Sequence, residues 1–341
     1  MRSTLFYIPS ALELGGGSVP LFGWGLGLAI WAVLGGAGFA WAAARHGFGP
    51  ACRALGVPIM VVAAMLLWIL PALDDGAGVP IRGYGVMLLV AAATGTWLSI
   101  VRGRAAGFDA DTILALGTEI FLWGLVGARL FYVLEYRAQF FGPTMSLAES
   151  LAAIVNIAGG GLVVFGSLPT AALAAWRFAA RRKLSLVRLA DCIAPGLLVG
   201  LAIGRIGCFL NGCCYGGPCD LPWGVRFPAG TGPAGHYPAP DGGSIPLHPA
   251  QLYAAIDAAI LAALAVVSTP LFRRDGEVFA LVLTLHPISR ILLEMIRVDE
   301  PPALGTPLSI SQLVSLALLA VAAALWWWIG RQPARGPAGG L

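Results

Sequence analysis

The chain has 341 residues, of which 58% are hydrophobic and only 11% are charged, and its formal net charge is +4. Soluble domains carry about 25% charged residues, so this composition excludes an ordinary soluble protein, and the small net charge gives no sign of nucleic-acid binding. The first residues lack a charged segment followed by a compact apolar one, so we expect no cleavable signal peptide.

Apolar segments long enough to cross a bilayer recur along the whole chain. A spanning helix needs about 20 mostly apolar residues. The sequence offers nine such segments, at about 21–44, 54–71, 84–101, 112–134, 162–180, 190–210, 250–270, 277–296 and 308–330. The longest connection between them is 213–249, which is rich in Gly and Pro. The pattern predicts an all-α integral membrane protein, a polytopic helical bundle with a small extracytoplasmic head at 213–249.

The basic residues predict the orientation. Thirteen of the 21 Lys and Arg fall on one side of the predicted spans and five on the other. Short cytoplasmic loops carry the excess of positive charge. We therefore expect a cytoplasmic C-terminus and cytoplasmic loops at 45–53, 102–111, 181–189 and 271–276. The N-terminus and the head are expected outside.

Three arginines, Arg129, Arg205 and Arg290, fall within predicted spans. A charged residue at membrane depth costs about 2.5–3.5 kcal/mol on insertion scales and usually marks a functional site. The alternative is an arginine that extends its head to the interface, and for Arg129 the two interpretations are equally good. Glycines at 200, 204 and 207 flank Arg205, which lets a neighbour approach closely. A guanidinium also suits a bidentate phosphate contact.

Polar residues gather at two further places. Arg290, Glu294 and Arg297 are spaced to share one face of a helix, and we favour a binding role over an ion pair that merely eases insertion. His248 and Tyr253 lie at the start of the span after the head. There a histidine can bind phosphate or transfer protons near neutral pH, although a capping role fits the spacing equally well.

Four of the six cysteines are clustered at Cys208, Cys213, Cys214 and Cys219. Such a cluster is typical of disulfides, of a metal site or of small apolar packing. Paired Cys-x-x-Cys spacing is absent, so we expect no metal and no cofactor. A disulfide and a reactive free thiol stay open as alternatives.

Several motifs together resemble the prolipoprotein diacylglyceryl transferase family. The family hallmark Gly-Arg-x-Gly-Asn-Phe-x-Asn-x-Glu-x-x-Gly is matched by Gly204, Arg205, Gly207, Phe209, Asn211 and Gly216. Further matches, in family order over about 84–330, are Tyr84-Gly85, Gly127-Ala128-Arg129, His248-Pro-Ala-Gln251-Leu-Tyr253, Arg290-x-x-x-Glu294-x-x-Arg297 and Leu308-Ser-Ile-Ser-Gln312.

The resemblance implies transfer of the diacylglyceryl group of phosphatidylglycerol to the lipobox cysteine of a prolipoprotein, at the bacterial inner membrane. It implies Arg205, Arg290, Glu294 and His248 as catalytic residues. The implied substrate-binding residues are Arg205, Tyr84, Asn211, Gly216, Arg129, Gln251, Tyr253 and Arg297. The family's His-Gly-Gly-Leu is Phe165-Gly166-Ser167-Leu168 here, and its hallmark Asn and Glu are Cys208 and Cys213.

The expected organisation is an extra N-terminal helix pair, 1–78, followed by a seven-helix transferase-like core, 79–341. The partners implied by the resemblance are phosphatidylglycerol, the prolipoprotein cysteine and the bilayer, with no nucleic acid. The competing hypothesis is a phospholipid-binding or thiol-redox membrane protein that keeps a phosphate site without the chemistry.

Overall fold

The structure is a computed structural model that describes residues 4–14, 17–141, 146–156, 160–298, 303 and 305–334. The chain divides into two compact units, Met1–Val86 and Met87–Leu341. Each unit is described by itself.

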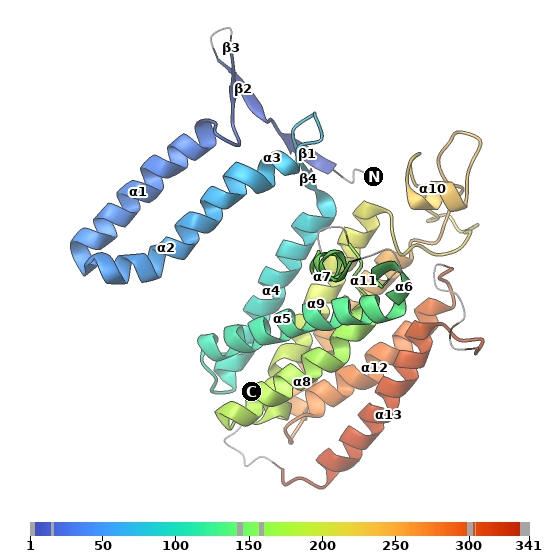
Figure 1. Cartoon of the computed structure of the whole chain (residues 1–341). Coiled ribbons are helices and arrows are strands. Elements are labelled where there is room, and N and C mark those ends of the chain that lie inside the picture. Colours follow the sequence, from blue (N-terminus) through green and yellow to red (C-terminus); the bar gives the residue numbers. More distant parts are fainter. Residues whose placement is uncertain are drawn as a thin grey trace. The chain divides into compact units, whose positions relative to one another are not determined.

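The N-terminal unit contains a helical hairpin and two short strand pairs (Figure 1). Its helix α1 (Leu26–His46) packs against a second helical segment made of α2 (Phe48–Ala64), the π-helical turn η1 (Met65–Ile69) and α3 (Leu70–Ala72). Gly47 joins the two with φ 86°. Strand β1 (Thr4–Ile8) pairs antiparallel with β4 (Val79–Arg82), and β2 (Ala11–Leu14) pairs with β3 (Gly17–Pro20). The helix pair was expected from the apolar pattern, whereas these short strands were not.

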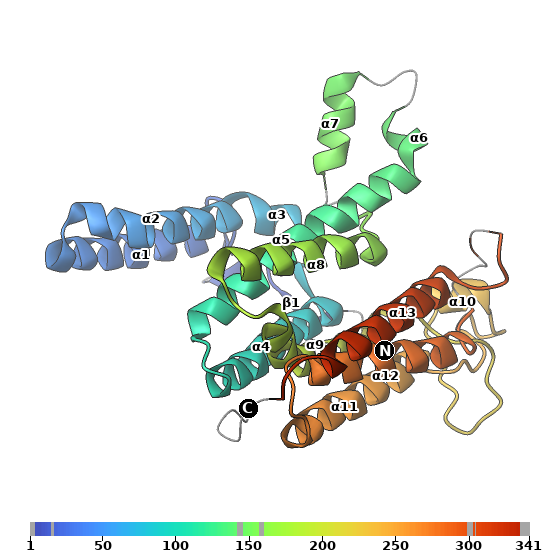
Figure 2. The same cartoon turned by 90° about the horizontal axis from the view of Figure 1, so that it is seen from below.

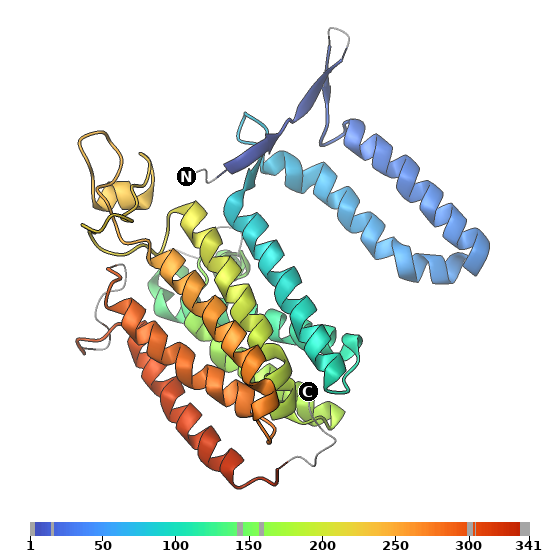
Figure 3. The same ribbon diagram turned by 180° about the vertical axis from the view of Figure 1, so that it is seen from behind.

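The second unit is a helical bundle, seen from two further directions in Figures 2 and 3. It contains the continuation of α4 (Gly83–Ala105), then α5 (Ala110–Glu135), α6 (Arg137–Phe140), α7 (Leu147–Val155), α8 (Val164–Arg182), α9 (Leu186–Asn211), α10 (Gly232–His236), α11 (Ala250–Ser268), the 3₁₀ turn η2 (Thr269–Leu271), α12 (Glu277–Glu294) and α13 (Ile310–Gly330). The main packing pairs are α5 with α8, α9 with α11, and α12 with α13.

Glycines lie where helices of the bundle approach each other most closely. A Cβ atom at Gly127 of α5 would collide with Gly166 and Thr170 of α8, and one at Gly95 of α4 would lie 2.7 Å from the carbonyl oxygen of Gly196 in α9. Bilayer helices gain stability from such close backbone approach, because lipid provides no hydrophobic drive between helices.

Among the described residues, seven helical segments are long and apolar enough to cross a membrane: Leu26–His46, Phe48–Ala72, Gly83–Ala105, Ala110–Glu135, Leu186–Asn211, Ala250–Leu271 and Ile310–Gly330. The other two expected spans, α8 and α12, form helices of 19 and 18 residues that each contain three charged residues, and they are not among these seven. The protein is therefore an all-α, multi-pass membrane protein, as the sequence predicts.

A buried carboxylate fixes the start of α12. Asp191 of α9, only 1% exposed, accepts hydrogen bonds from the backbone N–H of Gly276 at 2.7 Å and of Phe279 at 2.9 Å. These N–H groups belong to the first turn of α12, where no intrahelical partner exists. The contact ties α12 to α9 and so helps to place the polar residues at the far end of α12.

The head is a compact loop region with a small core of its own. It follows α9, which ends at Gly212 with φ 74°. Tyr215, Phe227 and Leu247 form its buried centre, and short backbone bridges join Leu247 to Pro218 and Val225. The head thus has fixed structure, although it contains only one short helix, α10.

Candidate active site at the head end of the bundle

Gly216 holds together three segments that are far apart in the sequence. Its N–H donates to the carbonyl oxygen of His248 at 2.9 Å, and the N–H of Gly217 donates to the carbonyl oxygen of Ile296 at 3.0 Å. A Cβ atom at position 216 would lie 2.7 Å from the Cβ of His248 and 3.1 Å from the oxygen of Ile296. Only glycine fits this gap without displacing a neighbour, and it brings the ends of α9, α11 and α12 to one place.

A buried ion pair lies at the end of α12. Nη2 of Arg290 is 2.8 Å from Oε2 of Glu294, and the two side chains are 15% and 4% exposed. The same Nη2 donates to Oγ of Ser311 at 2.8 Å. Ser311 is held in the first turn of α13, which starts with a capping box between Ser309 and Gln312. These contacts fix the position of the Arg290 guanidinium.

Arg297 joins this group in a different way from the one expected. The sequence spacing placed it on the same helical face, but α12 ends at Glu294 and Arg297 follows in a turn. Its backbone bridges to Gly216, and its Nε lies 3.9 Å from Oε2 of Glu294. Glu294 therefore lies between two arginines, one on the helix and one beyond its end.

Arg205 is the half-buried cation of α9. It makes no hydrogen bond or ion pair with any other residue that the structure describes. An unpaired charge at this depth is costly, whereas a bound anion would compensate it. Arg205 is therefore the strongest candidate for a ligand contact in the bundle.

His248 and Tyr253 are in contact, as the sequence allowed. Nδ1 of His248 is 3.3 Å from the Tyr253 hydroxyl oxygen, which accepts a hydrogen bond from the indole N–H of Trp223 at 2.8 Å. The contact joins His248 to the aromatic side chains at the start of α11. The other ring nitrogen, Nε2, has no hydrogen-bond partner among the described residues.

Gln251 and Asn211 contact the cysteine loop. Nε2 of Gln251 donates to the carbonyl oxygen of Cys213 at 2.7 Å. Gln251 is 1% exposed, and its Oε1 has no hydrogen-bond partner among the described residues. Asn211, at the end of α9, is exposed. The thiol of Cys213 itself donates to the carbonyl oxygen of Cys208, with sulfur and oxygen 3.7 Å apart. Gln251 thus holds the backbone of Cys213 in place.

All six cysteines carry free thiols in the structure, so the alternative of a disulfide finds no support in its geometry. Cys208, Cys213 and Cys214 lie together, while Cys219 is buried in the head and outside that group. The neighbouring thiols of Cys208 and Cys213, followed by the charges of Arg297 and Arg205, lower the pKa of the Cys214 thiol. The cluster is thus close to the arginines of the site.

Arg129 lies outside this group of residues, and backbone carbonyl oxygens accept all of its hydrogen bonds. Its Nε donates to Ile154, its Nη1 to Gly160 and Gly161, and its Nη2 to Ala153 and Asn156, at 2.7–2.9 Å. These five bonds use every N–H that a guanidinium has, so none is left for a substrate. The geometry also differs from an arginine extended to water, because Arg129 is only 9% exposed.

Comparison with known proteins identifies the relatives of this chain. The family model described as prolipoprotein diacylglyceryl transferase matches residues 72–328. The chain belongs to the prolipoprotein diacylglyceryl transferase family. A protein of Rhodopirellula baltica named phosphatidylglycerol–prolipoprotein diacylglyceryl transferase is 39% identical over 240 residues, which cover 68% of this chain and 48% of that protein.

Two further relatives carry the same name. The protein of Bifidobacterium adolescentis is 32% identical over 60% of this chain and 62% of its own length. The protein of Gloeobacter violaceus is 33% identical over 64% of this chain and 78% of its own length. The chain thus matches only about half to two thirds of the length of the Rhodopirellula and Bifidobacterium relatives.

The structure explains several of the residues through which the chain resembles the diacylglyceryl transferase family. Gly127 allows α5 and α8 to touch, Gly216 closes the site, and Gln251 anchors Cys213. Tyr84 lies in the first turn of α4, in the N-terminal unit, so its role stays a prediction. Phe165, at the family's histidine position, is half-buried in α8 and carries no proton-transfer group.

One polar pair inside the bundle was not expected from the sequence. Asp257 of α11 accepts a hydrogen bond from Oγ of Ser289 at 2.7 Å. A single acid inside an apolar span was the available signal for Asp257.

Proposed function

We propose that this chain transfers the diacylglyceryl group of phosphatidylglycerol to a cysteine thiol of a prolipoprotein. The observation that carries the proposal is Arg205, a half-buried cation without a protein partner among the described residues. A phospholipid phosphate is the anion that a bilayer supplies at such a site. The family membership and the names of the relatives point to the same lipid.

Arg290 is the second proposed phosphate contact. Glu294 and Ser311 hold its guanidinium in place, and a preorganised donor stabilises developing charge without reorganising during the reaction. Glu294 thereby acts as a positioning residue. His248 is proposed to meet the glycerol head group or the leaving phosphate, since its free ring nitrogen is available for a hydrogen bond.

An apolar groove between α9 and α11 suits the acyl chains. A cavity of about 810 Å³ runs between α9 and α11 and is lined by residues that include Ile203, Ile206, Leu252 and Ile256. Ile206 follows Arg205 in the sequence of α9, and Leu252 follows Gln251 in that of α11. The diacylglyceryl group is proposed to lie in this groove.

The transfer itself is a substitution at a glycerol carbon. The sulfur of the acceptor thiolate forms a bond with that carbon, while the bond from carbon to the phosphate oxygen breaks and glycerol phosphate leaves with the electron pair. Positive charge near the phosphate favours the leaving group. Arg205 and Arg290 supply that charge in the proposal.

We further propose that the head and this site face the outside of the bacterial inner membrane, with the N-terminus outside and the C-terminus in the cytoplasm. The C-terminal ends of α4, α8, α11 and α13 lie at the opposite end of the bundle from the head (Figures 1 and 3). Arg102, Arg104, Arg181, Arg182, Lys183, Arg273, Arg274 and Arg331 lie in or directly after these ends. Such an excess of positive charge is typical of the cytoplasmic side.

The test uses the full chain in phosphatidylglycerol vesicles with a lipobox peptide. We expect a peptide whose cysteine gains a diacylglyceryl group, detected by mass spectrometry, and at least a hundredfold slower product formation with Arg205→Ala. Arg226→Ala is the matched control, because its side chain is 59% exposed in the head. A folded protein that binds phosphatidylglycerol but forms no product with lipobox peptides would favour the non-catalytic alternative and overturn the proposal.

A further inference from the structure

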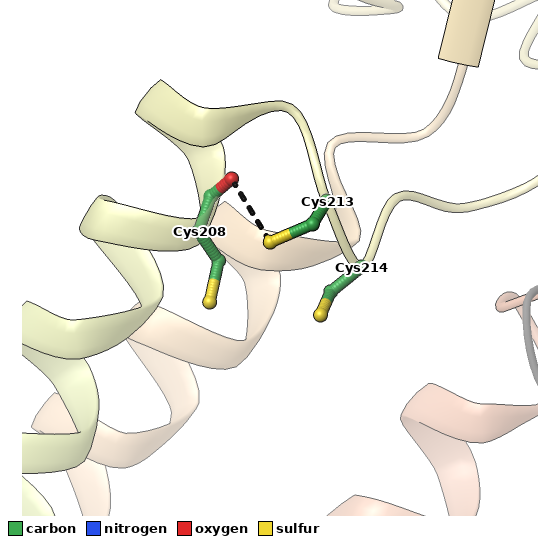
Figure 4. A group of neighbouring side chains, drawn as sticks. All are labelled: Cys208, Cys213 and Cys214. Carbon is green, nitrogen blue, oxygen red and sulfur yellow. Dashed lines mark hydrogen bonds between the residues drawn. The ribbon is translucent and has the colours of Figure 1, made fainter. Parts of the chain in front are cut away.

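Three thiols converge where α9 meets the head (Figure 4). The sulfur atoms of Cys208, Cys213 and Cys214 all lie within 4.8 Å of one another. Cys208 is in the last turn of α9, and the other two follow the helix end at Gly212. Thiolate sulfur is the ligand type that selects zinc and monovalent copper over magnesium or calcium.

The backbone is shaped to bring these sulfurs together. Gly212 reverses the chain with φ 74°, and the N–H of Cys213 donates back to the carbonyl oxygen of Cys208 at 3.2 Å. Cys214 then adopts φ 61°, one of only two positive values among the described non-glycine residues. Such a conformation costs about 1–2 kcal/mol for a residue with a Cβ. Gln251 fixes the loop from α11 through the Cys213 carbonyl.

We propose that Cys208, Cys213 and Cys214 form a three-thiolate zinc site whose fourth coordination position accepts the cysteine thiol of the substrate. The second half of this inference rests on the proposed transferase function. The expectation of no metal followed from the absence of paired Cys-x-x-Cys spacing. In the structure the three thiols come together without that spacing, because one lies on α9 and two lie on the loop that folds back beside it.

The dimensions fit zinc. A Zn–S bond is about 2.3 Å, so two thiolates of a tetrahedral site are about 3.8 Å apart. The three sulfurs, already within 4.8 Å, reach that separation by shifts of about 1 Å or less, which side-chain rotation supplies. Three protein ligands with one open position are the pattern of catalytic zinc sites, whereas structural sites are closed by a fourth.

The charges also fit. Three thiolates around a divalent cation leave one net negative charge, and a substrate thiolate adds another. Arg297 bridges through its backbone to Gly216, two residues after Cys214. Its positive charge offsets part of this negative charge in surroundings where it would otherwise be costly.

The zinc site would supply a means to activate the acceptor thiol. Phe165, and Cys213 on its own, offer no group that could take the proton of that thiol. On binding zinc the acceptor thiol releases its proton to water, because a thiol that coordinates the metal is deprotonated. Its sulfur then forms the bond to the glycerol carbon as the carbon–oxygen bond to phosphate breaks. The thioether product is a weaker ligand than the thiolate, so it leaves the metal.

Metal analysis of the full chain in detergent tests the site without reference to activity. We expect about one zinc per chain, and in the cobalt-substituted protein an intense sulfur-to-cobalt charge-transfer band. Cys208→Ser, Cys213→Ser and Cys214→Ser should each lower zinc occupancy at least tenfold. Cys219→Ser is the matched control from the same part of the chain and should keep its zinc.

A second measurement avoids dependence on variants that fail to fold. Titration of the wild-type protein with a mercurial should release the zinc in step with loss of three thiols. Folded wild-type protein that takes up neither zinc nor cobalt at these thiols would overturn the proposal. So would a disulfide among the three in non-reducing mass analysis of protein prepared without oxidant.

The role in transfer has its own readout. A lipobox peptide should shift the cobalt charge-transfer band, and the same peptide with serine in place of cysteine should not. Full transfer by chelated, zinc-free protein would overturn the zinc inference and leave the proposed function standing. Zinc bound by the three thiols, with no transfer to lipobox peptides, would overturn the proposed function and leave the metal site standing.

Discussion

The N–H of Gly216 donates a hydrogen bond to the carbonyl oxygen of His248 at 2.9 Å, across a gap that has no room for a side chain. This single contact joins the loop after α9 to the start of α11, and its neighbour Gly217 extends the junction to the end of α12. The proposed phosphate contacts, the thiols and His248 therefore all depend on how closely three backbone segments approach.

Gly216→Ala should disrupt this junction. The added methyl group would meet His248 and the carbonyl of Ile296, and overpacking of this kind costs about 1–3 kcal/mol. We expect a lower midpoint of thermal unfolding and at least tenfold slower transfer. Gly235→Ala is the control, because no atom lies within 4 Å of its would-be Cβ. Equal behaviour of the two variants would contradict the role given to Gly216.

Glu294→Gln should impair the positioning of Arg290. The variant keeps the side-chain volume but removes the charge that holds the guanidinium at 2.8 Å, and loss of one partner from a buried pair is strongly destabilising. Transfer should slow at least tenfold. The comparison is Glu119→Gln, whose pair with Arg177 at 3.4 Å is about one third exposed and should be worth no more than about 1 kcal/mol. Similar losses in both variants would argue against a special role for Glu294.

Arg129→Lys should lower stability without weakening lipid binding. Lysine has three donors at one point and cannot reach the five carbonyls that Arg129 binds. We expect the unfolding free energy to fall by about 2 kcal/mol or more, with an unchanged KM for phosphatidylglycerol below the unfolding temperature. A raised KM in a fully stable variant would instead restore the substrate contact expected from the sequence.

Asp191→Ala should loosen the start of α12. It leaves the N–H groups of Gly276 and Phe279 without the carboxylate that they bind. A buried donor without a partner costs about 1–3 kcal/mol. Unfolding followed by circular dichroism should show the loss, whereas Asp241→Ala, at a side chain 68% exposed, should change the unfolding free energy by about 0.5 kcal/mol or less. Equal unfolding free energies of the two variants would contradict the role of Asp191 as the cap of α12.

The sequence was sufficient for the membrane architecture and for the family. Long apolar segments are a strong signal, because a bilayer imposes both their length and their composition. It was less informative about the ends of the elements. The short strands of the N-terminal unit carry little pattern, and α12 stops at Glu294 although the apolar and charged spacing continues to Arg297.

The sequence indicates which polar residues could form the candidate site, but not the contacts that they make. Arg205, Arg290 and Glu294 were notable because charge within a span is rare. Arg129 gave the same signal, yet it binds carbonyls from segments whose approach depends on tertiary packing. The thiol cluster depends on two left-handed residues, Gly212 and Cys214, and no spacing rule specifies such a turn.

The polarity of α8 and α12 has a consequence for biogenesis. Each packs against a more apolar helix that is synthesised earlier, α8 against α5 and α12 against α11. A helix of low mean hydropathy or with charges close together is poorly recognised on its own by the insertion machinery. We expect both to enter the bilayer only alongside those earlier helices, so that a chain lacking α5 should leave α8 outside the membrane in a glycosylation-mapping experiment.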